Sequence, residues 1–267
     1  MPASTTYAHT LSEYQRRWNK SVLSLLAVIG AICVACYYVR LFDGQRLAEG
    51  IPSIYSLVRE MLPPNFSGAQ SWLRPVIDTL AMSIAGTALA VLFALPLAFL
   101  AARNTSPHPA VYQLARGILN GLRSIPELIM GIIFVAAVGF GALPGVLALG
   151  VHSIGMVGKF FAEAIEHAHN APIEASRAAG HTPLQVIFYG ILPQVVPQMA
   201  DVSIYRWEYN FRASTVMGMV GAGGIGFELM GALRLMQYRD LSAILILVLL
   251  LVTLVDGLSG YLRGQFK

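Results

Sequence analysis

The chain has 267 residues, of which 56% are hydrophobic and only 12% are charged. Soluble domains carry about 25% charged residues, so this composition excludes an ordinary soluble protein and predicts an integral membrane protein. The formal net charge is +4, but the basic residues are scattered, which argues against nucleic-acid binding and favours loops anchored beside a membrane.

The first quarter of the chain predicts one span and an outer loop. Residues 1–20 are polar and contain Arg16 and Arg17 near their end, which favours a cytoplasmic N-terminal tail. The apolar segment over residues 21–39 is longer than the core of a signal peptide and is expected to cross the membrane. One-sided apolar spacing over residues 51–62 predicts an amphipathic helix at the outer surface. Residues 21–75 would thus form the first span and its outer loop, and residues 76–267 the core.

The core contains five further apolar segments that are long enough to cross a bilayer. They are expected at residues 76–102, from 111 or 114 to 139, 144–165, 195–220 and 241–262. The uncharged stretch from Leu128 to Gly158 is too long for one helix, and the glycine-rich run at 139–145 supplies a turn within it. The prediction is an all-α membrane protein with six transmembrane helices and both termini in the cytoplasm.

Residues 170–193, between the fourth and fifth spans, predict a polar helix–glycine–helix elbow on the cytoplasmic side. Asn170 is expected to cap the first helix, with Pro172 in its first turn. Gly180 should end that helix, because glycine enters the left-handed region cheaply. Thr182 is expected to cap a second helix, which begins at the proline that follows. A compact, capped elbow between membrane segments suggests a docking site for a partner.

Charged side chains lie inside two of the predicted spans. Arg123 and Glu127 are four residues apart, which would place them on one helical face. The fifth span contains Arg206, Glu208 and Arg212, and the last two are again four apart. Intramembrane charges normally face the bundle interior, where they either lock helices together or mark a transport path. The sequence leaves both interpretations open.

The functional interpretation is a path for an anion. Two arginines against one glutamate leave an excess of positive charge in the fifth span, and guanidinium groups match tetrahedral oxyanions bidentately. We therefore expect a mildly basic, hydroxyl-lined path. Its candidate residues are Arg123, Glu127, Arg206, Glu208, Asn210, Arg212, Ser214 and Thr215.

The sequence contains no convincing catalytic or metal-binding constellation. Cys33 and Cys36 lack the second pair that a zinc site needs, so we interpret them as apolar residues of the first span. His152 is interpreted as a histidine bonded to a neighbouring helix. The G-x-G-x-x-G run at 221–226 does not follow a strand, so it predicts a close helix approach or a re-entrant bend rather than dinucleotide binding. No P-loop sequence occurs, so we expect no ATP hydrolysis by this chain alone.

At the elbow the chain resembles the membrane subunits of ABC importers. Their cytoplasmic signature begins Glu-Ala-Ala, has Gly six residues after the Glu and ends in Leu-Pro. The matching residues here are Glu174, Ala175, Gly180, Leu192 and Pro193. Ser176 replaces the second alanine, and Gly190 stands where a branched apolar residue is usual, which is expected to loosen the second helix. In that family the elbow is the coupling helix, which lies in a cleft of the ATP-binding subunit.

Longer runs are similar to the permeases of phosphonate importers. They are MLPPNFS (61–67), VAAVGFGALPGVLAL (135–149), YGILPQVVPQ (189–198) and YRWEYNFRASTVMGMVGAGGIG (205–226). The resemblance implies the type I, MetI-like permease fold with a cytoplasmic coupling helix, in the bacterial inner membrane. It also implies a homodimer, two ATP-binding subunits and a periplasmic or extracellular phosphonate-binding protein. The cargo would be a phosphonate, with phosphite or a phosphate ester as further candidates. ATP and Mg²⁺ would belong to the partner subunits, and this chain would carry no cofactor.

Two other functions remain open from the sequence. Permeases of methionine importers share the GAGGIG part of the fifth-span run, so a methionine-type or other amino-acid permease is one alternative. An ion-coupled secondary carrier could also use intramembrane charges, although such a carrier has no need of a capped elbow.

Overall fold

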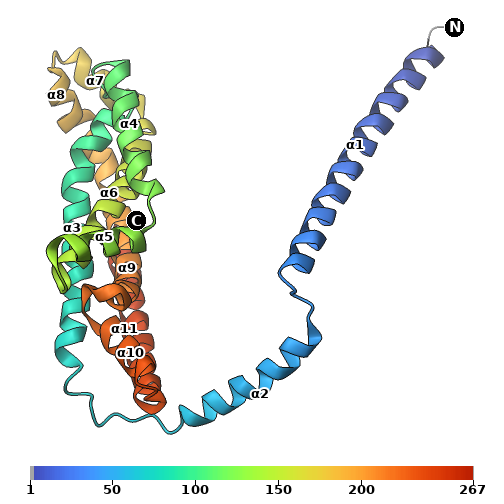
Figure 1. Cartoon of the computed structure of the whole chain (residues 1–267). Coiled ribbons are helices and arrows are strands. Elements are labelled where there is room, and N and C mark those ends of the chain that lie inside the picture. Colours follow the sequence, from blue (N-terminus) through green and yellow to red (C-terminus); the bar gives the residue numbers. More distant parts are fainter. Residues whose placement is uncertain (1–2, 267) are drawn as a thin grey trace. The chain divides into compact units, whose positions relative to one another are not determined.

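The computed structural model describes residues 3–266, and over that range the chain forms helices and no strand (Figure 1). The expected all-α membrane fold is confirmed. Four helices in the described range are long and apolar enough to cross a membrane, and the number rises to six if each of two bent helix pairs counts as one span. The exact count of six therefore stays a prediction. The chain divides into two compact units, one up to Arg59 and one from Glu60 onward.

The first unit consists of two helices, α1 (Ala3–Tyr38) and α2 (Gly44–Glu60). Helix α1 begins well before the apolar residues of the first predicted span, which it continues without a break. The carboxylate of Asp43 accepts a hydrogen bond from the Arg46 amide at 3.3 Å and so caps the start of α2. The expected amphipathic helix is present, but it begins earlier than predicted and ends at Glu60, ahead of the two prolines.

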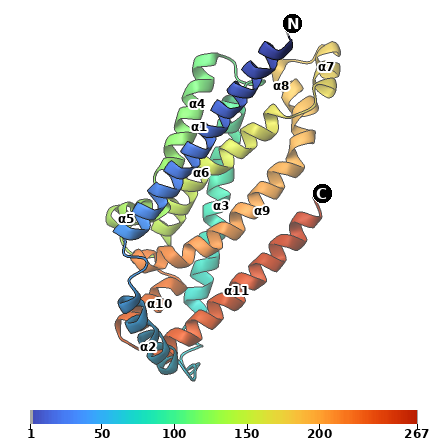
Figure 2. The ribbon, with the colours of Figure 1, turned by 90° about the vertical axis from the view of Figure 1, so that its right-hand side faces the viewer.

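The second unit is built around α3 (Leu73–Ala101) and α6 (Ala142–Glu166). Helix α6 is the central one, because 61% of its most apolar window is buried against 33% for α3. Small residues allow the two helices to approach closely: a Cβ on Gly86 would lie 3.1 Å from the Cβ of Leu149. Figure 2 shows α6 between α4 (Pro109–Ser124) and α9 (Leu192–Met217), and α6 contacts both.

The third predicted span is broken, contrary to expectation. Helix α4 ends at Ser124, α5 (Glu127–Val138) begins at Glu127, and the two are bent by 85°. The cause is Pro126, which cannot donate to the preceding turn and forces Ile125 into an extended conformation, with φ −86° and ψ 121°. Arg123 and Glu127 therefore lie on different helices, and the prediction that they share a helical face is wrong.

The elbow follows α6 and leads into α9. Its elements are α7 (Asn170–Ala178), α8 (Pro183–Val186) and the π-helical turn η1 (Ile187–Ile191). Gly180 has φ +78° as expected, and the amide and hydroxyl of Thr182 both donate to the side-chain oxygen of Gln185, at 2.8 and 3.0 Å. Two details differ from the prediction. The helix starts at Asn170 itself, so His169 takes the cap position, and α8 runs through η1 directly into α9 instead of forming a separate short helix.

The glycine-rich run after α9 allows a close helix approach, as predicted. The elements there are η2 (Gly218–Ala222), α10 (Ile225–Arg234) and α11 (Tyr238–Gly264). Three glycines have positive φ, between 71° and 103°, and they turn the chain by 58° between α9 and α10. The tightest contact is at Gly226, where a Cβ would lie 1.7 Å from the carbonyl oxygen of Thr215.

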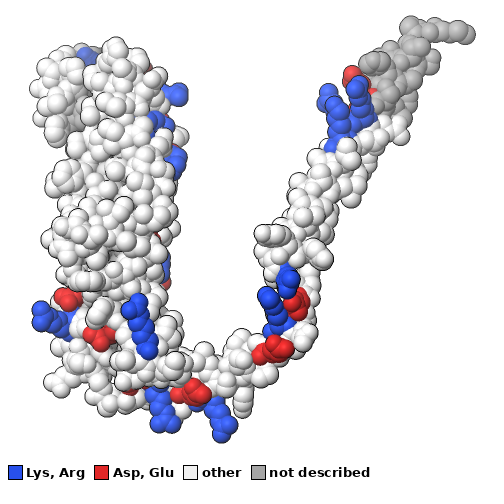
Figure 3. Space-filling model, in the orientation of Figure 1, with Lys and Arg blue, Asp and Glu red and all other residues white. Residues whose placement is uncertain are grey.

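On one face of the second unit, most of the charged side chains lie towards its ends (Figure 3). On the face drawn in Figure 3, most of the middle of this unit carries neither acidic nor basic side chains. At one end Asn65 ties the loop before α3 to the start of α11: its amide donates to the Arg239 carbonyl at 3.0 Å and its side chain to Asp240 at 2.7 Å. A surface without charges between polar ends is typical of a protein that lies across a bilayer.

We expect Gly226→Ala to destabilise the second unit. The added methyl group would overlap the Thr215 carbonyl oxygen and push α9 and α10 apart, at a cost of about 1–3 kcal/mol or more. The midpoint of thermal unfolding in detergent should fall by several degrees. Gly257→Ala on α11 is the matched control, because no atom lies within 4 Å of the added carbon. Equal midpoints for the two variants would contradict the close approach of α9 and α10.

Candidate functional site

One buried chain of hydrogen bonds joins α9 to α6 and α3. Arg206 is 5% exposed, and its Nε donates to the hydroxyl of Ser153 at 2.8 Å. Ser153 in turn donates to the side-chain oxygen of Asn210 at 3.1 Å, and the Asn210 nitrogen donates to Thr87 at 2.9 Å. Asn210 and Ser153 are fully buried. Buried polar groups of this kind are stable only when bonded, so the chain fixes the rotation of α9 against the two central helices.

Glu127, at the start of α5, lies beside this chain. The hydroxyl of Tyr209 donates to one of its carboxylate oxygens at 3.1 Å, and the other oxygen lies 3.8 Å from Nη2 of Arg206. The Arg206 guanidinium also lies over the ring of Tyr209, 4.3 Å from its centroid. His152 approaches Glu127 from α6 at 3.9 Å, and its other ring nitrogen contacts the Ile125 carbonyl at 3.1 Å. The prediction that His152 bonds to a neighbouring segment is thus confirmed.

A second polar cluster joins the opposite face of α9 to α11. Glu208 is 8% exposed and accepts from Arg212 at 3.0 Å, from Ser259 at 2.7 Å and from Arg263 at 3.4 Å. Arg212 also donates to Asp256 at 2.8 Å. The predicted pairing of Glu208 with Arg212 is confirmed, and the contacts to α11 extend it to four charged groups.

The fifth span has no excess of positive charge: Asp201 within it is a second acidic residue, and other helices add Glu127 and Asp256. Arg206 lies against Glu127, while Arg212 and Arg263 lie against Glu208 and Asp256. Each cluster therefore balances in formal charge, and the predicted basic path is wrong in that respect. Asp256 could have been identified from the sequence as a candidate partner of an arginine, because it is an acidic residue within the sixth predicted span.

The other predicted path residues are more scattered. Arg123 is exposed at the end of α4. The hydroxyls of Ser214 and Thr215 donate to carbonyls of their own helix, those of Phe211 and Arg212, both at 2.7 Å. Sequence reasoning missed the bonding roles of Thr87, Ser153, Tyr209, Ser259 and Arg263. Nothing local distinguishes the serines and Thr87, because such residues occur throughout helices.

The elbow is held to α9 by Gln194. The side-chain oxygen of Gln194 accepts from the His169 amide at 3.0 Å, and its nitrogen donates to the carbonyls of His169 and Gly190. Gly190 is buried, and a Cβ there would lie 3.2 Å from the Cα of Ile173. The missing side chain thus lets η1 pack on the α7 backbone, and the expectation that Gly190 loosens this region is wrong. Among the predicted signature residues, Glu174 and Ala175 are exposed and Ser176 is buried against His181, 2.8 Å away.

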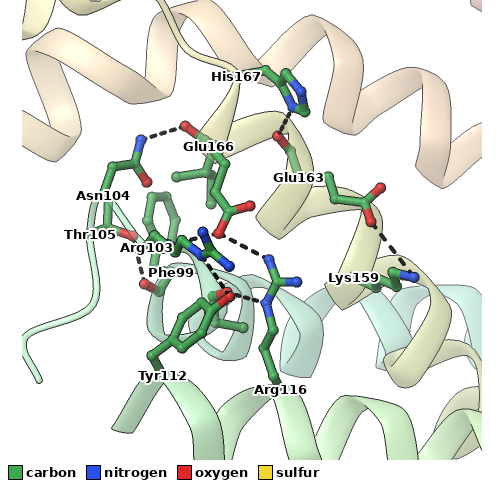
Figure 4. Close-up of polar contacts among 12 residues, drawn as sticks. Phe99, Arg103, Asn104, Thr105, Tyr112, Arg116, Lys159, Glu163, Glu166 and His167 are labelled. Carbon is green, nitrogen blue, oxygen red and sulfur yellow. Dashed lines mark hydrogen bonds and ion pairs between the residues drawn. The ribbon is translucent and has the colours of Figure 1, made fainter. Parts of the chain in front are cut away.

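A third cluster fixes the end of α6 just before the elbow (Figure 4). One carboxylate oxygen of Glu166 accepts from the Arg103 amide and from the Arg116 guanidinium, both at 2.9 Å. The Arg103 side chain bonds the Tyr112 hydroxyl at 3.0 Å, and this contact raises the pKa of Arg103 above its ordinary value. Asn104 donates to the Ile165 carbonyl at 2.6 Å. One network of polar contacts therefore joins the loop after α3, the start of α4 and the end of α6.

Comparison with known proteins agrees with this architecture. The model of the family "Binding-protein-dependent transport system inner membrane component" matches residues 94–266. The chain belongs to this family. It is a multi-pass membrane permease, a transport subunit of the ABC importer kind.

Two curated relatives carry names that specify a cargo. The phosphite transport system permease protein PtxC of Stutzerimonas stutzeri is 66% identical over 97% of this chain and 94% of that protein. The phosphate-import permease protein PhnE of Mycolicibacterium smegmatis is 42% identical over 83% of this chain and 42% of that protein. The chain is therefore similar over most of its length to permeases named for phosphite and phosphate transport, in agreement with the resemblance that the sequence motifs indicated.

A solved structure supports the type I, MetI-like fold. A chain of the inward-facing MetNI methionine ABC transporter superposes with a TM-score of 0.63 at 24% identity, covering 73% of this chain and 96% of that one. At this identity the likeness concerns the fold alone.

We expect Glu208→Ala to destabilise the permease more than removal of a surface carboxylate. The change removes the acceptor of Ser259 and of Arg263, and one of the two acceptors of Arg212, which keeps Asp256. The cost should be about 2 kcal/mol, below the roughly 3–5 kcal/mol of a fully buried pair because both arginines are partly exposed. Glu163→Ala, which breaks an exposed pair with Lys159, should cost less than about 1 kcal/mol. Thermal unfolding in detergent compares the two, and an equal loss would contradict the role given to Glu208.

Proposed function

We propose that the chain is the permease subunit of an ATP-binding cassette importer that moves phosphorus oxyanions into the cytoplasm. The cargo class comprises phosphite and phosphonates, with phosphate esters as a further candidate. One observation carries the proposal: near-complete coverage at 66% identity by a phosphite transport permease. The site chemistry is compatible, because Arg206 offers a guanidinium fork of the kind that binds tetrahedral oxyanions.

In this proposal ATP is hydrolysed by two partner subunits that dock on the elbow, residues 170–193. Glu174, Ala175 and Gly180 are exposed there and would form the docking face, with Leu192 and Pro193 at the start of α9. The sequence has no P-loop of its own, so ATP and Mg²⁺ would be held by the partners and this chain would need no cofactor.

The assembly would contain a second permease, which we take to be another copy of this chain, and an outer phosphonate- or phosphite-binding protein. Both termini and the elbow would lie in the cytoplasm. Residues 1–20 would form the N-terminal tail, residues 21–75 the first span and outer loop, and residues 76–267 the permease core. Alternating access would then expose the polar face of α9 in turn to the two sides of the membrane.

The decisive experiment is uptake by the reconstituted complex of permease, ATP-binding subunits and binding protein in vesicles. ATP-dependent accumulation of phosphite or a phosphonate, and not of methionine, is the expected result. Accumulation of methionine would favour the amino-acid alternative. Uptake that persists without the ATP-binding subunits and stops when the proton gradient is dissipated would favour a secondary carrier.

The elbow assignment predicts a specific effect at Gly180. Its φ of +78° strains any β-branched residue, whereas asparagine tolerates this conformation. Gly180→Val should therefore distort the turn between α7 and α8 and weaken co-purification of the ATP-binding subunits at least tenfold. Gly180→Asn should retain them. Full retention and full ATPase coupling in Gly180→Val would show that the subunits dock elsewhere.

A further inference from the structure

The contact between Glu127 and Arg206 is incomplete. Nη2 of Arg206 and Oε2 of Glu127 are both buried, and neither has a hydrogen-bond partner in the described residues. They lie 3.8 Å apart, beyond hydrogen-bond distance. The hydrogen bonds that these two groups do make are short: Nε of Arg206 donates to Ser153 at 2.8 Å, and Oε1 of Glu127 accepts from Tyr209 at 3.1 Å. Nε2 of His152 lies 3.9 Å from Oε2 of Glu127, which is also beyond hydrogen-bond distance. One free donor and one free acceptor thus lie side by side.

Two buried charges that do not form a hydrogen bond are destabilising, because each loses its hydration and no protein hydrogen bond fully replaces it. The surrounding contacts prevent the pair from closing. Arg206 is held towards α6 by Ser153, and Glu127 is held by Tyr209 and placed by the start of α5. Nη2 of Arg206 and Oε2 of Glu127 therefore remain a free donor and a free acceptor, at a distance that allows a third group to bond to both.

We propose that this couple recognises a singly protonated phosphorus oxyanion, with one P–O⁻ accepting from Arg206 and the adjacent P–OH donating to Glu127. The match is chemical. A protonated oxyanion presents an acceptor and a donor on neighbouring oxygens, while a fully ionised one would set a negative oxygen against the Glu127 carboxylate. This inference rests on the proposed function and adds which ionic form of the cargo the permease accepts.

The couple lies near the surface of the chain, and its two unpaired atoms are themselves buried, so cargo would reach them when α5 and α9 separate in the proposed alternating-access cycle. The side chain of Glu127 is 22% exposed, and Tyr205, one turn before Tyr209, is 49% exposed. The first amides of α5 follow the break at Pro126 and lack intrahelical acceptors, which adds a weakly positive element beside the carboxylate. A ligand would thus meet Arg206, Glu127 and the start of α5 together.

The proposal predicts that uptake depends on pH because the cargo itself gains or loses a proton. Oxyanions of this class lose their second proton near neutral pH, at about pH 6 for a phosphate monoester. Raising the pH therefore removes the P–OH donor. The titratable and charged groups that face Glu127 are Arg206 and Tyr209 from α9 and His152 from α6. Because His152 lies 3.9 Å from Glu127, its contribution must be separated by mutation.

The test measures initial uptake of phosphite from pH 5.5 to 8.5 by the reconstituted complex, at saturating binding protein. With the wild-type chain, uptake should fall as the cargo loses its second proton. Glu127→Gln keeps the size of the side chain but replaces the acceptor charge. It should reduce uptake at pH 6 by about tenfold, the effect of one lost charged hydrogen bond, and flatten the pH profile. Glu127→Asp should partly restore the pH dependence.

Two controls make the result decisive. Glu208→Gln removes a carboxylate from the other face of α9 and should leave the shape of the pH profile unchanged, as should His152→Gln. All complexes contain the same partners, so a pH response of those proteins cancels in the comparison. Basal ATP hydrolysis and size-exclusion profiles report whether each variant assembles. A Glu127→Gln complex that assembles and keeps the wild-type pH profile overturns the inference. A wild-type complex without ATP-dependent phosphite uptake would instead overturn the proposed function.

Discussion

The structure depends on one constraint: a charge inside a bilayer must be neutralised and hydrogen-bonded by the protein itself. Helix α9 carries Arg206 and Glu208 on opposite faces, so it must lie between helices that supply partners on both sides. Ser153 on α6 and Glu127 on α5 serve one face, and Ser259 and Asp256 on α11 serve the other. The position of α9 is thereby fixed by polar contacts, and the apolar packing of α3 on α6 supplies the frame.

The break at Pro126 is part of the same constraint. In an unbroken helix Glu127 would lie beside Arg123, and the two would satisfy each other. The proline ends α4, turns the chain by 85° and makes Glu127 the first residue of α5, next to α9. A backbone effect of one residue therefore transfers a carboxylate from its local partner to a distant one. The resulting pair is held open by its neighbours, which is what gives the site unmet hydrogen-bonding capacity.

The parts of this architecture that follow from local rules could be predicted from the sequence. Apolar length located α3, α6 and α11, glycine and proline signals located the elbow, and the spacing of Glu208 and Arg212 gave their contact. The failures concern contacts between distant segments. Two arginines against one glutamate predicted a positively charged fifth span, because the count left out Asp201 of the same span and because Glu127 and Asp256 reach α9 only through tertiary packing. Gly190 was misjudged for the same reason, since its role depends on the α7 backbone that packs against it.

Continuity between the elbow and α9 suggests how docking and cargo are linked. Because α8 passes through the π-turn η1 into α9, and Gln194 joins that junction to His169, a displacement of the elbow would be expected to move the helix that carries Arg206. Glu127 lies on α5, which is held separately and does not move with the elbow as one helix. Rotation of α9 would therefore change the distance between Nη2 of Arg206 and Oε2 of Glu127, which lie on different helices. Distances between residues of α9 itself would change less. If the elbow docks the ATP-binding subunits and the pair binds the anion, as proposed, a motion of the elbow would change anion binding at this pair.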